Sequence, residues 1–171
     1  MAAALREHLR IPGMGETTAR YFRDKLAMRM KARDEGIKVP AFTRILHHPD
    51  IKEFMETIPA PWVLKPRMGA SSAKVKKIYH ADELWNELEK LGDKQMSYLL
   101  EQYIPGDVYH VDSVVNDYGV VFAGVSKYGI PMLDLNTSGG IFTTRMIKKG
   151  SADDKALRKI NAHLKIGRAH V

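Results

Sequence analysis

The sequence predicts an α+β fold whose strands pair mainly antiparallel. Two β-rich runs, Val108 to Val115 and Val120 to Ser126, flank Asn116-Asp117-Tyr118-Gly119, which is a strong hairpin signal. Stretches with helical spacing separate the other strand candidates, but helices and strands do not alternate regularly. A regular alternation is typical of a doubly wound parallel sheet, so its absence favours antiparallel pairing.

In the first 60 residues, breakers and apolar spacing indicate helices. A short helix is expected over residues 2–9, ended by Pro12 and Gly13. A longer helix is expected over residues 17–35. In that stretch Phe22, Leu26 and Met30 recur every fourth residue, and Gly36 stands at the C-terminal cap. An extended segment over residues 37–46 is interrupted by Pro40. Pro49 and Asp50 then open a helix that carries Ile51, Phe54, Met55 and Ile58 at helical spacing.

Strands and helices of the remaining chain follow from the same signals. Strands are expected over residues 62–64, 75–78 and 97–104, and Ala81 to Leu91 is predicted to be a helix that stops at Gly92. After the hairpin, residues 137–140 look flexible, residues 141–147 suit a strand, and residues 153–164 suit a helix.

Composition limits the class of protein. The chain has 171 residues, enough for one domain or two small lobes, no cysteine, and a formal net charge of +7. The basic residues are spread along the chain, which favours a solvated surface over a dedicated nucleic-acid stripe. No apolar run approaches the length of a membrane span and no signal peptide is evident, so we expect a cytoplasmic protein without a membrane partner.

Residues 61–78 form the most informative stretch. An apolar run ends in Lys65 and Pro66, a loop of small residues follows over 69–73, and a second strand begins near Val75. An ammonium group beside small residues suits polyphosphate, because the backbone N–H groups can approach the oxygens closely. Since the loop leads into a strand, it is not a P-loop. Taken alone, the pattern favours an ordinary hairpin with an exposed lysine.

Two other groups of residues have simple structural alternatives. His47 and His48 are adjacent and point in different directions, so the start of a helix explains them better than a metal site. From spacing alone, Lys25 is expected to be a solvent-facing helix lysine paired with a neighbouring acid.

Four stretches in order resemble the ATP-grasp family of ATP-dependent carboxylate ligases. They are Arg23-Asp24-Lys25-Leu26 with Gly36 to Pro40, Trp62 to Pro66 with Gly69 to Ser72, Leu99 to Ile104, and Gly106 to Asp112. The resemblance covers roughly residues 15–130. It implies two small α+β lobes with mainly antiparallel sheets that grip ATP.

The resemblance also implies roles for individual residues. Lys25 and Lys65 would contact the α- and β-phosphates, with Gly69, Ser71 and Ser72 closing over them. Glu101 would accept from the adenine 6-amino group, while the backbone of Gln102, Tyr103 and Ile104 bonds the ring edge and Val63, Leu100 and Ile104 supply apolar walls. Val108 stands where many members hold the ribose with a glutamate, so Asp107, His110 or Asp112 would substitute, and Arg145 could contact a carboxylate or the γ-phosphate.

Compared with the family, the chain is expected to be incomplete at both ends. Residues 1–14 would be a remnant of a preceding lobe, 15–98 the first lobe, 99–165 the hinge and the start of the second lobe, and 166–171 a non-native tail that resembles a sequencing-adapter peptide. The magnesium ligands of the family would lie beyond this segment. The cofactors implied are thus ATP and Mg²⁺, with no metal ligand in this chain.

The function implied is ATP binding within a ligase that activates a small-molecule carboxylate as an acyl phosphate for attack by an amine or similar nucleophile, with this chain inactive alone. A nucleotide-binding module without catalysis and a basic nucleic-acid-binding domain are the alternatives. The sequence names neither the carboxylate nor the nucleophile, and it leaves the oligomeric state open.

Overall fold

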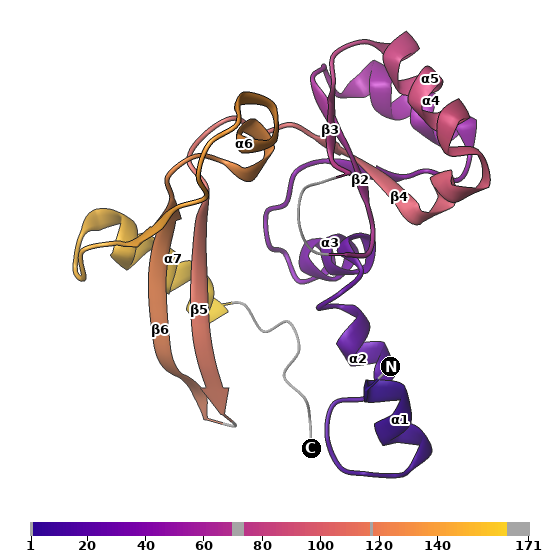
Figure 1. Cartoon of the computed structure of the whole chain (residues 1–171). Coiled ribbons are helices and arrows are strands. Elements are labelled where there is room, and N and C mark those ends of the chain that lie inside the picture. The colour runs from indigo at the N-terminus through magenta and orange to yellow at the C-terminus, as the bar shows by residue number, and fades with distance from the viewer. Residues whose placement is uncertain (1, 70–73, 117, 164–171) are drawn as a thin grey trace. The chain divides into compact units, whose positions relative to one another are not determined.

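The computed structural model describes residues 2–69, 74–116 and 118–163 (Figure 1). It divides into two compact units: unit 1 ends at Ile104 and unit 2 begins at Pro105. Each unit contains its own antiparallel sheet together with helices, which confirms the α+β prediction. Within the described residues, no helix has the length and apolar content needed to cross a bilayer.

The sheet of unit 1 has the strand order β1-β4-β2-β3. Its two central strands, β2 (Trp62–Pro66) and β4 (Tyr98–Gln102), have five residues each, whereas the edge strands β1 (Phe42–Arg44) and β3 (Lys76–Ile78) have three. All neighbouring strands pair antiparallel. The two strands predicted around Lys65 are therefore present as β2 and β3, with β4 on the other side of β2, and residues 70–73 of the loop lie outside the described residues.

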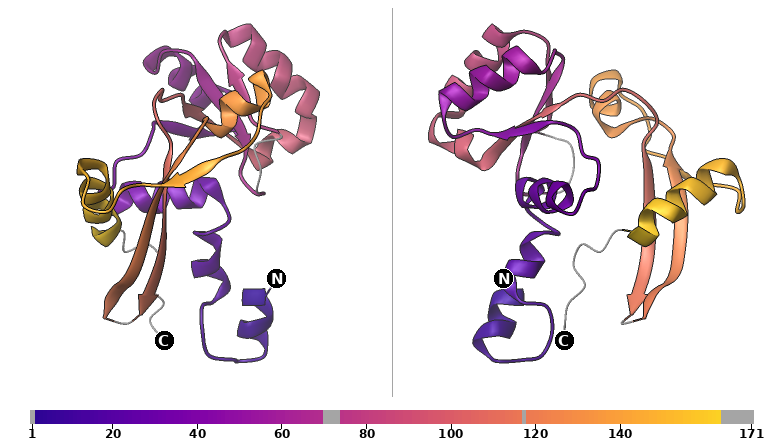
Figure 2. Two further views of the ribbon diagram at one scale, coloured as in Figure 1. Left: turned by 60° about the vertical axis from the view of Figure 1, so that its left-hand side comes forward. Right: turned by 180° about the vertical axis from the view of Figure 1, so that it is seen from behind.

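One face of this sheet carries the hydrophobic core. Helices α4 (His48–Thr57) and α5 (Ala81–Leu91) lie together on that face, and both views of Figure 2 show the same arrangement. The buried core residues are Ile45, Ile51, Phe54, Trp62, Leu64, Ile78, Leu84, Leu88 and Leu100. Because side chains alternate along a strand, residues next to Leu64 and Leu100 face the opposite side of the sheet.

Local signals account for the two core helices. His47 is the N-terminal cap of α4 and Pro49 lies in its first turn, which confirms the predicted helix start. Gly92 ends α5 with φ +51° and ψ −132°, a conformation open mainly to glycine. A 3₁₀ helix, η1 (Gly92–Ser97), connects α5 to β4.

The prediction of one long helix over residues 17–35 is wrong. The chain forms α1 (Ala2–His8), then two separate helices, α2 (Glu16–Arg20) and α3 (Lys25–Asp34). Asp24 breaks the pattern, because its side chain accepts from the backbone N–H groups of Leu26 and Ala27 and so caps a new helix. The apolar stripe fails as well, since Leu26 is buried while Phe22 and Met30 are exposed.

Unit 2 is built on the predicted hairpin. Strands β5 (Tyr109–Asn116) and β6 (Gly119–Tyr128) pair antiparallel, and β7 (Thr144–Met146) adds to β6. Helix α7 (Ala152–His163) packs on β6 and β5 (Figure 1). The flexible stretch expected over residues 137–140 is partly wrong, because α6 (Met132–Ser138) reaches into it before Gly139 ends the helix.

Candidate nucleotide-binding site

Lys65 and Glu101 lie on the sheet face opposite the hydrophobic core of unit 1. Glu101 in β4 is the partner of Val63 in β2, and Lys65 follows two residues later, so both charged side chains project from the same face. Lys65 Nζ forms an ion pair with Glu101 Oε2, and the two side chains are only 14% and 5% exposed. The lysine is therefore not the exposed residue of an ordinary hairpin.

Arg29 completes a buried ion triad with these two residues. It lies in α3, and its Nε donates to Glu101 Oε1 at 2.5 Å, so each carboxylate oxygen has its own cation. We had not expected this role, because 72 residues separate Arg29 from Glu101. The available signal is its spacing, one helical turn after Lys25 in α3.

Lys25 is the first residue of α3 and contacts the small-residue loop. Its Nζ donates to the carbonyl oxygen of Gly69 at 2.9 Å, and its backbone N–H donates to the carbonyl oxygen of Arg67 at 2.9 Å. Gly69 has φ +108°, a value that L side chains rarely adopt, and it is exposed. Ser71 and Ser72 lie outside the described residues.

The three cations exceed the charge of the single carboxylate by two. Burial lowers the pKa of Lys65, and the positive charges of Arg29 and Lys25 lower it further, while Glu101 acts in the opposite direction. Burial also lowers the pKa of Lys25, together with the charges of Arg23 and Arg29. Crowded cations of this kind are stabilised by a bound anion, so the site is suited to a polyanionic ligand.

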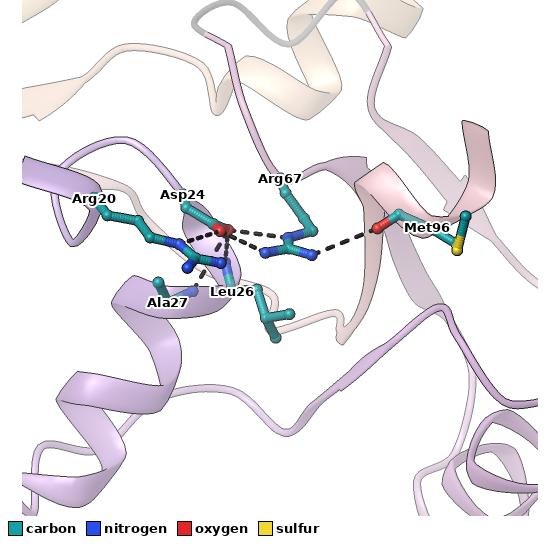
Figure 3. A network of polar contacts seen from close by, with 6 residues as sticks. All are labelled: Arg20, Asp24, Leu26, Ala27, Arg67 and Met96. Carbon is teal, nitrogen blue, oxygen red and sulfur yellow. Dashed lines mark hydrogen bonds and ion pairs between the residues drawn. The ribbon is translucent and has the colours of Figure 1, made fainter. Parts of the chain in front are cut away.

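Asp24 and Arg67 form a second buried ion pair beside Lys25 (Figure 3). Asp24 is 1% exposed and accepts hydrogen bonds from Arg67 and Arg20. Burial would raise the pKa of Asp24, but the bonds and the positive charge of Arg67 outweigh it, and the pKa is lowered to about 2. Sequence reasoning missed this pair, and only the adjacency of Asp24 to Lys25 and of Arg67 to Pro66 hinted at it.

Residues 102 and 103, which follow Glu101, are held by neighbouring segments of unit 1. The backbone N–H of Gln102 donates to the carbonyl oxygen of Ala41 at 2.8 Å, and that of Tyr103 donates to Pro61 at 3.2 Å. Lys77 Nζ lies 3.7 Å from the centroid of the Tyr103 ring. Ile104 follows and is exposed.

The prediction that Leu100 forms an apolar wall of the adenine site is wrong. Leu100 is fully buried in the core under α4 and α5, on the sheet face opposite Glu101, so it cannot line a site beside that carboxylate. Val63 is on the same face as Glu101, as the expectation requires.

The remaining candidate residues lie in unit 2. Asp107 Oδ2 accepts from Lys127 Nζ at 2.5 Å, and Val108 is exposed. His110 Nε2 lies 3.4 Å from Asp112 Oδ2, while its Nδ1 is buried with no hydrogen-bond partner among the described residues. Arg145 is an exposed residue of β7 opposite Lys127.

The described residues contain no cluster of metal-ligating side chains. Across residues 2–69, 74–116 and 118–163, no three histidine, aspartate or glutamate side chains gather where they could hold a metal ion. In nucleotide sites Mg²⁺ is usually held by one or two carboxylates together with phosphate oxygens and waters, so a cluster of three protein ligands is not required for it.

The comparison with protein families decides the assignment. A family model described as "ATP-grasp domain" matches residues 22–163, which includes both lysines and the hinge strand. The chain belongs to the ATP-grasp family. This membership confirms the resemblance inferred from the four motifs.

The relatives of this ATP-grasp chain include ligases. The L-arginine-specific L-amino acid ligase of Bacillus subtilis is 31% identical over 135 residues, which cover 75% of this chain and 33% of that protein. The D-alanine–D-alanine ligase A of Bacillus cereus is 30% identical over 104 residues, which cover 59% of this chain and 35% of that protein. The ATP-grasp chain thus spans about a third of the length of these curated relatives.

Solved structures share the ATP-grasp fold. An L-amino acid ligase from Bacillus licheniformis matches with a TM-score of 0.70 and 20% identity, covering 98% of this chain and 39% of that chain. The D-alanine–D-alanine ligase from Bacillus anthracis complexed with ATP matches with a TM-score of 0.65 and 20% identity, covering 94% of this chain and 52% of that chain. At these identities the likeness supports the fold alone.

Proposed function

We propose that unit 1 binds the adenine nucleotide of an ATP-dependent ligase. The observation that carries the proposal is the buried triad of Arg29, Glu101 and Lys65, with Lys25 reaching the small-residue loop nearby. The three cations exceed the charge of Glu101 by two. A phosphate chain would balance that excess.

In this proposal Glu101 binds the adenine base, and the lysines bind the phosphates. Glu101 accepts from the adenine 6-amino group, because each carboxylate oxygen retains a lone pair after bonding one cation. Since the N–H groups of Gln102 and Tyr103 are already used, the ring edge pairs with their carbonyl oxygens and with the N–H of Ile104. Lys65 and Lys25 neutralise the α- and β-phosphates, and Gly69, Ser71 and Ser72 cover them.

The parent reaction proposed is carboxylate activation. A substrate carboxylate oxygen attacks the γ-phosphorus of ATP, the bond to the β-phosphate oxygen breaks, and an acyl phosphate and ADP result. An amine then attacks the acyl carbon, its nitrogen loses a proton to solvent, and phosphate leaves with the bond pair. The ligase activities named for the Bacillus relatives support this class. Positioning and charge neutralisation by Lys25, Lys65 and Arg29 would be the contribution of this chain.

A nucleotide-binding module without turnover is the second candidate. It is favoured by one observation: the described residues contain nucleotide-suited cations but no metal-ligand cluster. The two candidates differ in product formation, so ADP release from ATP in the presence of amino acids and Mg²⁺ separates them.

Calorimetric titration of the full chain with ATP, ADP and GTP tests the nucleotide site. We expect ATP and ADP to bind, and GTP to bind at least about tenfold more weakly, because guanine presents a carbonyl oxygen to Glu101 where adenine presents a donor. Lys65→Ala should weaken ATP binding about tenfold or more, since a charge-assisted contact is lost.

The matched control is Lys90→Ala. Lys90 is an exposed lysine of α5 in the same unit, paired with Glu87, and α5 covers the opposite sheet face. It should bind ATP as the unaltered chain does. Absence of ATP binding by the folded chain, or equal losses in the two lysine variants, would contradict the proposal.

A further inference from the structure

Arg67, two residues before the first residue of the small-residue loop, Gly69, is tied to the start of α3 (Figure 3). Arg67 Nε and Nη2 donate to the two oxygens of Asp24 at 3.1 and 2.5 Å, which is a bidentate arrangement. The backbone N–H of Arg67 also donates to the carbonyl oxygen of Ser97 at 2.8 Å. Arg67 therefore fixes the end of β2 and the approach to the loop to two separate parts of unit 1.

The same carboxylate fixes the start of α3. Asp24 Oδ1 accepts from the backbone N–H of Leu26 at 3.0 Å and of Ala27 at 3.5 Å, so it is the cap of the helix whose first residue is Lys25. Two more bonds join the segments directly: Lys25 N–H to the carbonyl oxygen of Arg67, and Lys25 Nζ to that of Gly69. The cap and the loop anchor thus share one side chain.

We propose that Asp24 and Arg67 are positioning residues that hold Lys25 and the start of the small-residue loop together, and thereby set affinity for the phosphate chain without acting on the base. This rests on the nucleotide site proposed above. Lys65, by contrast, is held by the pairing of β2 with β4 and by its ion pair with Glu101, so the effect is expected at Lys25 and the start of the loop. The bonds of Glu101 go instead to Arg29 and Lys65, so the effect should not reach the base.

The burial of Asp24 strengthens its ion pair with Arg67, so the pair can hold the start of the loop in place. The Asp24 side chain is 2% exposed and that of Arg67 is 24% exposed, so water does not screen their attraction as it does for a surface pair. The planar guanidinium fork matches both carboxylate oxygens, whereas a lysine would offer a single point charge. Arg67→Lys therefore keeps the charge and removes the two-point attachment.

Arg20 offers a matched control because it bonds the same carboxylate from a different helix. Its Nε donates to Asp24 Oδ2 at 3.2 Å from α2, and its side chain is 57% exposed. If Asp24 acts only as a helix cap, Arg20→Lys and Arg67→Lys should behave alike. If the pair positions the loop, only Arg67→Lys should change the loop and its ligand.

Amide hydrogen exchange on the full chain tests the attachment without any ligand. In Arg67→Lys, we expect the amides of Lys25 and of residue 67 to exchange about tenfold faster or more, because local opening becomes easier. The amides of Leu64 and Leu100 in the central strands should not change, and Arg20→Lys should leave all four unchanged. Unchanged exchange in Arg67→Lys, or equal acceleration in Arg20→Lys, would overturn the proposal.

Titration with ADP and adenosine tests the consequence for binding. Arg67→Lys should raise the Kd for ADP about tenfold and that for adenosine less than about twofold. In a Lys25→Ala background, Arg67→Lys should add little further loss for ADP, since the two act through the same contact. Equal losses for both ligands, or additive losses in the double variant, would refute positioning through Lys25.

The exchange and titration experiments together distinguish an error in this inference from an error in the proposed nucleotide site. A folded, unaltered chain that binds neither ADP nor adenosine refutes the nucleotide site and, with it, the effect on phosphate affinity. The exchange measurement then still decides whether Asp24 and Arg67 hold the start of the loop to α3.

Discussion

Replacing Asp24 with asparagine should destabilise unit 1 in a pH-dependent way. The pKa of Asp24 is lowered from 3.8 to about 2 in the folded protein, by bonds and charge from Arg67 that outweigh burial. At 1.36 kcal/mol per pKa unit, ionised Asp24 contributes about 2 kcal/mol to the free energy of unfolding at pH 7. The asparagine side chain would retain a capping oxygen but not the charge.

The sign of the pH dependence follows from the lowered pKa. A carboxyl group whose pKa is lower in the folded state stabilises the protein above its unfolded pKa, and this contribution is lost as pH falls through the folded pKa. The window for Asp24 therefore runs from 3.8 down to about 2. At pH 3, about half of the contribution should remain.

Tryptophan fluorescence isolates the relevant unit. The chain has two tryptophans, Trp62 and Trp85, and both lie in unit 1. Urea unfolding of the unaltered chain and of Asp24→Asn, followed by this signal, should give a difference of about 2 kcal/mol at pH 7 and about 1 kcal/mol at pH 3.

The control is Asp34→Asn, which alters an exposed aspartate of the same unit whose side chain is 60% exposed. It should change stability by less than about 0.5 kcal/mol at either pH. A difference for Asp24→Asn that is equal at both pH values, or is no larger than that of the control at pH 7, would refute the reasoning.

Three further substitutions in unit 1 can be followed by the same urea and fluorescence assay. Leu100→Ala removes a fully buried core side chain and should cost about 2–5 kcal/mol, so a loss below about 1 kcal/mol would contradict its place under α4 and α5. Gly92→Ala should cost about 1–3 kcal/mol through the backbone alone, because no atom lies within 4 Å of the added Cβ; a neutral result would argue against the φ of +51°. Arg29→Ala leaves Glu101 with Lys65 as its cation and should cost about 1–3 kcal/mol, whereas an unchanged midpoint would show that the triad is not formed.

Elements with local signals could be predicted from the sequence. The helix start at Pro49, the glycine stop at Gly92 and the hairpin signal before Gly119 each specify an element by short-range chemistry, and α4, the end of α5 and the β5–β6 pair are found there. The break at Asp24 was missed because an aspartate inside an apolar repeat is ambiguous until its partners are known. Helix α6 was missed because Thr137, Ser138 and Gly139 are typical of loops as well as of helix ends.

The same distinction between local signals and distant partners applies to the residues of the candidate site. Lys25, Lys65 and Glu101 were named from ordered motifs, and the structure brings Lys65 together with Glu101 and Lys25 together with Gly69. Arg29 and Arg67 were not named, because their partners lie 72 and 43 residues away and no local pattern marks them. Tertiary pairing of this kind becomes visible only when α3, β2 and β4 are placed in one unit.

The short edge strands of unit 1 have a consequence for solubility. A sheet edge offers unpaired backbone groups to other chains, and length and apolar character make such an edge prone to aggregation. Strands β1 and β3 end the sheet after three residues each, and β3 carries Lys76 and Lys77. Replacing both lysines with valine would create the run Val75 to Ile78 without a charge, a segment suited to pairing with its own copies. We therefore expect the lysines of β3 to disfavour association of the concentrated protein through this edge.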